Sequence, residues 1–154
     1  MHALVRSAFV ETVLTVLLTI GTMAAADFTG TWKFNPAKSQ HHRDLSEEML
    51  TIKRTGPDTF TSILDFVTKS GEKQHQEIVR ICDGKEHPSP LSGAAKGAVL
   101  ICQQGPGATR KFVERDNGKV VYEVTSTLSD DGKVMTNVWK YSNGEEDVLV
   151  FDKQ

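Results

Sequence analysis

The side chains best suited to metal binding are spread thinly through this sequence. Of its five histidines, only His41 and His42 are adjacent. Neighbouring side chains on an extended chain point to opposite sides, so this pair does not offer two ligands to one metal ion. A metal site would need His75 or His87 to converge with one of them. We therefore expect no metal and no cofactor, and no histidine follows His87 to ligate heme from the last strands.

Acidic and hydroxyl side chains show no catalytic arrangement either. The sequence contains no Gly-x-Ser-x-Gly motif, and its serines lie mostly in turn-like segments. Acidic pairs such as Glu47-Glu48 and Asp130-Asp131 fall at expected turns or strand starts, where solvated charges are the simpler interpretation. Asp65 and Glu123 are the two carboxylates that we consider for a barrel interior. Isolated carboxylates define no reaction class, so we predict that the protein is not an enzyme.

The two cysteines, Cys82 and Cys102, favour a disulfide. In an oxidising compartment an even pair is more often bonded than free. Closing a loop of about 20 residues would stabilise the fold by roughly 3 kcal/mol in the chain-entropy picture. Neither cysteine belongs to a Cys-x-x-Cys or Cys/His cluster, which argues against metal or redox chemistry. Two structural free thiols are the alternative.

The N-terminal segment has the pattern of a secretion signal. Arg6 precedes an apolar run over 13–20, and Ala24 and Ala26 supply the small residues of a cleavage site. The run is shorter than the roughly 20 residues of a membrane helix, although an uncleaved anchor is the alternative. We expect a signal peptide at 1–26 and one domain at 27–154, secreted or periplasmic, with no integral membrane span after cleavage.

The charge of the sequence excludes some kinds of binding partner. The chain carries 18 basic and 20 acidic residues, a formal net charge of −2, and its basic residues form no run. This balance argues against nucleic acid or an anionic membrane as the main partner.

About 128 residues follow position 26, enough for one hydrophobic core. We expect a monomer.

Turn signals divide the rest of the chain into strands. Three hairpins are marked by Asn-Gly or Asp-Gly, which tolerate the positive φ that tight turns need. No segment has helical periodicity. A polar connection is expected at 37–46 and an irregular loop at 86–97. The predicted strands are 28–34, 48–54, 59–68, 74–82, 98–103, 109–115, 120–128, 134–141 and 147–151.

Consecutive hairpins predict that neighbouring strands pair in order. A meander of about eight to ten antiparallel strands has two edges to protect, and closing on itself removes them. The predicted fold class is therefore all-β, an antiparallel up-and-down meander closing into a barrel. A β-sandwich or an open β-roll is the alternative.

Both ends of the predicted domain carry a recognisable pattern. The start reads Phe-Thr-Gly-Thr-Trp-Lys over 28–33 and continues to Lys38-Ser39, and the end has a Ser-Asp-Asp-Gly-Lys hairpin at 129–133 and a final Val-Phe-Asp-Lys-Gln. These segments resemble secreted bacterial lipocalin-like, calycin-type β-barrel proteins, many of them uncharacterised. The resemblance implies a lipocalin-like barrel in which Gly30 lets the first strand bend. It also implies that Trp32 closes the floor beneath Lys153 or Lys140.

Apolar strand faces predict where a ligand would lie. Aromatic and flexible apolar side chains recur at alternate positions, and inward-facing ones would line a cavity for a small hydrophobic molecule. The alternative is that they fill the barrel as a packed core. The candidate ligand-binding residues are Phe60, Phe66, Tyr122, Met135 and Trp139.

Two functions therefore follow from the sequence. The first is a secreted or periplasmic lipocalin-like barrel that binds a small hydrophobic molecule in its interior. The second is a packed barrel without a small-molecule ligand that acts as a protein-interaction module, such as a periplasmic inhibitor or an envelope accessory factor. In that case the contact surface would be 35–47 or 86–97.

Overall fold

The computed structural model describes residues 27–154, and the predicted signal peptide at 1–26 lies outside the described residues. The elements are strands joined by short turns, with one 3-10 turn, η1, in the first connection. They are β1 (Gly30–Phe34), η1 (Pro36–Lys38), β2 (Glu47–Arg54), β3 (Thr59–Val67), β4 (Lys73–Ile81), β5 (Glu86–Pro88), β6 (Val99–Gln104), β7 (Thr109–Asp116), β8 (Lys119–Leu128), β9 (Val134–Tyr141) and β10 (Glu146–Lys153).

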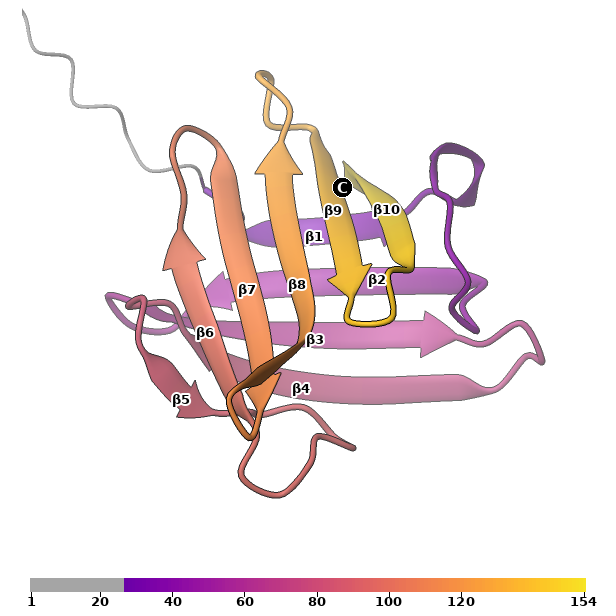
Figure 1. Ribbon diagram of the computed structural model, residues 1–154. Helices are drawn as coiled ribbons and strands as arrows, with labels where there is room; N and C mark the ends of the chain where they lie inside the picture. The colour runs from indigo at the N-terminus through magenta and orange to yellow at the C-terminus, as the bar shows by residue number, and fades with distance from the viewer. Residues whose placement is uncertain (1–26) are drawn as a thin grey trace, which may run out of the picture.

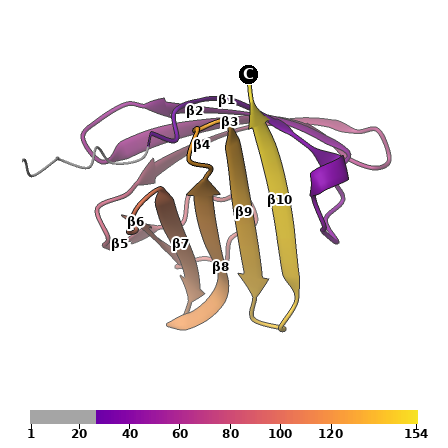
Figure 2. The same ribbon diagram turned by 90° about the horizontal axis from the view of Figure 1, so that it is seen from above.

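The strands form one antiparallel sheet in the order β4-β3-β2-β1-β10-β9-β8-β7-β6-β5. Neighbours in the chain pair with each other, and β1 pairs with β10, which joins the two ends of the domain. In Figure 1 strands β1–β4 run across the view while β6–β10 run upright, and Figure 2 shows the same two halves from above. The sheet thus folds over itself into a nearly closed barrel, which confirms the predicted all-β up-and-down meander.

The hairpin turns form where the dipeptides predict them. Asn117 and Gly118 join β7 to β8 with φ angles of 49° and 75°, the positive values that a type I′ turn requires. One detail differs from the sequence prediction, because a short strand, β5, forms at the start of the expected loop. A register shift between Glu114 and Arg115 interrupts the pairing of β7 with β8 and leaves Val120 38% exposed, away from the inward face of Tyr122.

The barrel has a seam between β4 and β6, because the sheet order places β4 at one edge and β5 and β6 at the other. Cys82 directly follows β4, Cys102 lies in β6, and the predicted disulfide joins them. Next to it, the Gly84 N–H donates a hydrogen bond to the Cys102 carbonyl at 2.9 Å. The covalent link therefore closes one end of the seam, where the strands share no ladder.

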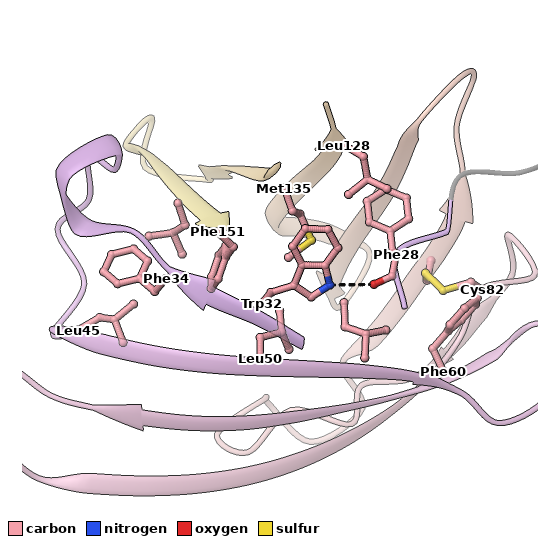
Figure 3. Close-up of a cluster of buried hydrophobic side chains, with 13 residues drawn as sticks. Phe28, Trp32, Phe34, Leu45, Leu50, Phe60, Cys82, Leu128, Met135 and Phe151 are labelled. Carbon is pink, nitrogen blue, oxygen red and sulfur yellow. Dashed lines mark hydrogen bonds between the residues drawn. A yellow bond between two sulfur atoms is a disulfide. The ribbon is translucent and has the colours of Figure 1, made fainter. Parts of the chain in front are cut away.

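The barrel floor is built around Trp32, which is fully buried. Its Nε1–H donates to the Phe28 carbonyl oxygen at 3.0 Å, as Figure 3 shows, and the Lys153 ammonium lies 5.1 Å from the centre of the indole ring. Gly30 has a φ of 123°, and a Cβ there would come 3.0 Å from Lys153 Cε. The positive φ and the close lysine explain why glycine begins β1.

Candidate functional site

The inward faces of the strands enclose a cavity of about 490 Å³ above this floor. Its volume lies within the range of small-molecule sites, roughly 300–1,000 Å³. The wall combines aliphatic and aromatic side chains with a few polar ones. All five residues named from the sequence border it: Phe60, Phe66, Tyr122, Met135 and Trp139.

These five residues divide between core and cavity wall. Phe60 and Met135 belong to the buried cluster near the floor, whereas Phe66 and Trp139 are only partly buried and pack against that cluster. Tyr122 is buried outside this cluster, and its hydroxyl donates a hydrogen bond to Glu114 Oε2 at 3.1 Å. The sequence left open whether the aromatic faces line a cavity or fill a core. The structure shows both: the floor is packed, and the space above it is open.

The most unusual group in the cavity is a buried arginine that the sequence analysis did not name. Arg110, on β7, is 3% exposed, and no described residue is a hydrogen-bond partner of its Nε or Nη2. Its guanidinium carbon lies 4.4 Å from the ring centre of Phe28 and 4.2 Å from that of Phe60. Burial, with help from Arg54 and Arg80, lowers the pKa of Arg110 to about 10. The side chain therefore still carries its positive charge at neutral pH.

The strand register places two further polar residues beside Arg110. Arg110 is paired with Ser126 on β8, and Ser126 is paired with Asn137 on β9. Directly opposite residues in an antiparallel pair have Cβ atoms roughly 5 Å apart, so the three form one row on the inner wall. The Asn137 Oδ1 is buried and has no described hydrogen-bond partner. The Arg110 guanidinium, the Ser126 hydroxyl and the Asn137 Nδ2 can donate hydrogen bonds to an anionic group, whereas the Asn137 Oδ1 can only accept one.

A second arginine enters the cavity from β4. The Arg80 Nη1 donates to Ser62 Oγ at 2.8 Å, and its guanidinium carbon lies 5.5 Å from the ring centre of Phe112. Burial lowers the pKa of Arg80. Arg80 thus adds a second cation to the wall near Arg110.

The opposite end of the cavity is bordered by the connection between η1 and β2, residues 39–46, which we call the strap. Asp147, on β10, holds the strap: its Oδ1 accepts from the His42 N–H at 2.8 Å, and its Oδ2 accepts from the Tyr141 hydroxyl at 3.0 Å. Burial would raise the pKa of Asp147, but the hydrogen bonds from His42 and Tyr141 outweigh it and lower the pKa. The carboxylate is therefore an anchor for the strap.

Glu48 and Arg43 bring charge to this strap end. Glu48, on β2, is 9% exposed, and burial raises its pKa to about 7 against the opposing influence of Arg43 and Arg80. Arg43, in the strap, stacks its guanidinium carbon 4.3 Å from the Trp139 ring centre. The indole Nε1 of Trp139 is buried without a described hydrogen-bond partner.

The two carboxylates considered for the interior from the sequence lie outside instead. Asp65 is 64% exposed and bonds to His75, and Glu123 forms an ion pair with Lys111 at 2.8 Å. The reason is strand alternation, since both stand next to residues whose side chains border the cavity. Among the described residues, strand alternation places the buried carboxyl groups of Glu48, Glu114 and Asp147 on the inner faces.

Three of the four described histidines are paired with aspartates rather than gathered together. His42 contacts Asp147, His75 contacts Asp65, and His87 contacts Asp83. Within residues 27–154, no three His, Cys, Asp or Glu side chains are placed to hold a metal ion. The same residues contain no helix long and apolar enough to cross a membrane.

Comparison with known proteins identifies the fold but not the family. No protein-family model matches the sequence, and no curated protein matches it. Among solved structures, the fluorescent protein UnaG is 15% identical with a TM-score of 0.61, covering 82% of this chain and 97% of that chain. Fatty-acid-binding protein 1 of Echinococcus granulosus is 14% identical with a TM-score of 0.60, covering 82% and 96%.

A third similar structure is a Schistosoma mansoni fatty acid binding protein in complex with arachidonic acid. It is 10% identical with a TM-score of 0.58, and the match covers 87% of this chain and 99% of that chain. At these identities the likeness shows the fold alone, an antiparallel up-and-down β-barrel. Any ligand must be argued from the cavity of this chain.

Proposed function

We propose that this protein binds and carries a small, largely apolar molecule with an anionic group, held inside the barrel. The observation that carries the proposal is Arg110, a charged guanidinium buried in the cavity wall whose Nε and Nη2 have no partner among residues 27–154. Burying a charge without a partner is costly, and an anionic ligand would remove that cost through charge-assisted hydrogen bonds. Ser126 and Asn137 stand beside Arg110 to complete the contact.

The cavity also suggests how such a molecule lies. Its anionic group would face Arg110 near the floor, and its apolar part would extend towards the strap between side chains such as Leu50 and Leu64. The space itself favours this function over a packed interaction module, since a packed barrel would have no room for a ligand. Two of the similar structures are fatty-acid-binding proteins, which supports an apolar carboxylate as the ligand class.

Binding without catalysis, at a location outside the cytoplasm, completes the proposed function. The similar structures that name a fatty acid are binding proteins, which supports binding without chemistry as the role. We further propose that the protein acts outside the cytoplasm. The signal-like pattern of residues 1–26 and the Cys82–Cys102 disulfide support that location.

A dye-displacement experiment tests this function. Anilinonaphthalene sulfonate, an apolar anionic dye, is bound to the purified protein and displaced with palmitate, or with its neutral alcohol. We expect palmitate to bind, and Arg110→Met to weaken palmitate binding roughly tenfold or more while changing alcohol binding little. Lys111→Met is the matched control, because Lys111 lies on the same strand and pairs with Glu123 outside the cavity. If neither the dye nor any apolar compound binds, the proposal is wrong.

A further inference from the structure

We propose that the ligand carries a second polar group, a neutral hydrogen-bond donor such as a hydroxyl or an amide N–H, and that Glu48 accepts this hydrogen bond at the strap end of the cavity. The inference rests on the proposed function, because it concerns the same cavity. It adds a ligand class: a molecule with polar groups at both ends and an apolar segment between them.

The starting observation is a buried carboxyl group without a described partner. Glu48 borders the cavity and is 9% exposed, and its carboxyl is influenced by burial, Arg43 and Arg80 but by no hydrogen bond from a residue between 27 and 154. Its inward neighbours along β2, Leu50 and Ile52, are apolar and buried, and its paired residue on β3 is Phe66. Buried polar groups are nearly always hydrogen-bonded in native proteins, so a carboxyl group that faces a cavity in this way calls for a donor inside the cavity.

The charges around Glu48 select the kind of donor. Arg43, in the strap, and Arg80, which reaches into the cavity from β4, both act on the Glu48 carboxyl electrostatically, so two cations already lie near it. A ligand ammonium would be repelled by the two guanidinium groups, and a second ligand carboxylate would be repelled by Glu48. A hydroxyl or an amide N–H satisfies the carboxyl oxygen without adding charge. A hydroxyl would also accept a hydrogen bond, and Trp139, whose buried indole Nε1 has no described partner, is one of the residues that border the same cavity.

Strand geometry separates the two polar positions. Arg110 packs against Phe60 at one end of β3, while Glu48 pairs with Phe66 towards the other end of the same strand. At about 3.3 Å per residue, Phe60 and Phe66 are roughly 20 Å apart along the strand. Side chains that reach inward shorten the span available to a ligand. Glu48 therefore meets the end of the molecule remote from its anionic group.

Palmitate and its ω-hydroxy derivative form the test pair, since they differ only in a donor at the far end. Their dissociation constants are measured by dye displacement with the wild-type protein, Glu48→Leu and Glu47→Leu. We expect the wild type to prefer the hydroxylated acid by roughly tenfold, the scale of one well-placed buried hydrogen bond. Glu48→Leu removes that preference, so that the variant binds the two acids equally. Glu47→Leu retains the preference, because Glu47 is the exposed neighbour on the same strand.

Each outcome separates this inference from the function on which it rests. Equal wild-type affinity for the two acids, or an unchanged preference in Glu48→Leu, overturns the inference and leaves the binding function standing. Failure of the wild type to bind either acid overturns the function itself. Glu48→Ala repeats the comparison if the leucine variant does not melt cooperatively, and the wild-type preference is a readout that needs no variant.

Discussion

Cys82 and Cys102 bond across the one boundary of the barrel where neighbouring strands share no ladder. Elsewhere each strand is held to the next by paired backbone groups, and β1 and β10 close the far side in the same way. At the seam, β4 and β6 are joined by the disulfide and by the Gly84 N–H to Cys102 carbonyl hydrogen bond. The disulfide therefore holds the two edges of the sheet together at the seam, as ladder hydrogen bonds hold neighbouring strands together elsewhere.

Removing this link will destabilise the protein. The bond closes a loop with a sequence separation of 20. We expect the Cys82→Ala/Cys102→Ala variant to lose roughly 3 kcal/mol of unfolding free energy on chain-entropy grounds. Urea denaturation with and without a reducing agent measures the change. Reductant should bring the wild type close to the variant and leave the variant unaffected; a reductant-insensitive wild type would show that the thiols are not bonded in solution.

Alanine at position 30 should destabilise the floor of the barrel. Gly30 has a φ of 123°, a conformation that L-residues rarely adopt, and a Cβ there meets Lys153 Cε at 3.0 Å. We expect Gly30→Ala to cost about 1–3 kcal/mol of unfolding free energy. Adding Lys153→Ala relieves the contact but not the backbone strain, so the double variant should recover only part of the loss. An alanine variant as stable as the wild type would contradict the assigned backbone conformation.

Much of the architecture can be read from alternation and turn residues. Asn117-Gly118 predicts a hairpin because a type I′ turn needs the positive φ that both residues adopt. The short β5 is missed because Pro88 argues against a strand, and only its pairing with β6 stabilises it. The register shift near Glu114 also leaves no local signal, since it depends on how β7 meets β8.

The candidate site is only partly readable from the sequence. Alternation places Arg110 on the same face as Phe112, so the signal for an inward arginine was present, although charged residues are expected outside. The same rule already excludes Asp65, which lies between Leu64 and Phe66 on β3. Alternation does not predict the volume of the barrel interior, because that volume depends on strand tilt and barrel closure. The cavity therefore needed the three-dimensional structure.

The burial of Glu48 predicts a pH-dependent effect on stability. Burial raises its pKa from the ordinary value of 4.5 to about 7, so the folded protein holds this proton more tightly than the unfolded chain. Stability from this group therefore falls as the pH rises from about 4.5 to about 7, and the cost is fully present above that window. We expect Glu48→Gln to exceed the wild type by roughly 3 kcal/mol near pH 8 and to match it near pH 4.

Thermal or urea unfolding of both proteins across this pH range measures the difference. Comparing the two curves cancels the other carboxylates, which titrate in both proteins. Glu47→Gln is the control and should follow the wild type at every pH, because Glu47 is exposed. A constant difference between Glu48→Gln and the wild type at all pH values would mean that Glu48 does not change protonation in this window.

The last prediction concerns how the buried charge of Arg110 affects the stability of the ligand-free protein. A buried guanidinium without a carboxylate partner destabilises the empty protein, and replacing buried charges by apolar side chains of similar size is often neutral or stabilising. We expect Arg110→Met, without ligand, to be as stable as the wild type or up to about 3 kcal/mol more stable. The same variant should lose affinity for anionic ligands, so that stability and binding change in opposite directions. Urea denaturation of the ligand-free proteins, with Lys111→Met as the control, measures the first effect. A marked loss of stability in Arg110→Met would instead make the stacking on Phe28 and Phe60 the main role of this arginine, as part of the floor rather than as a ligand contact.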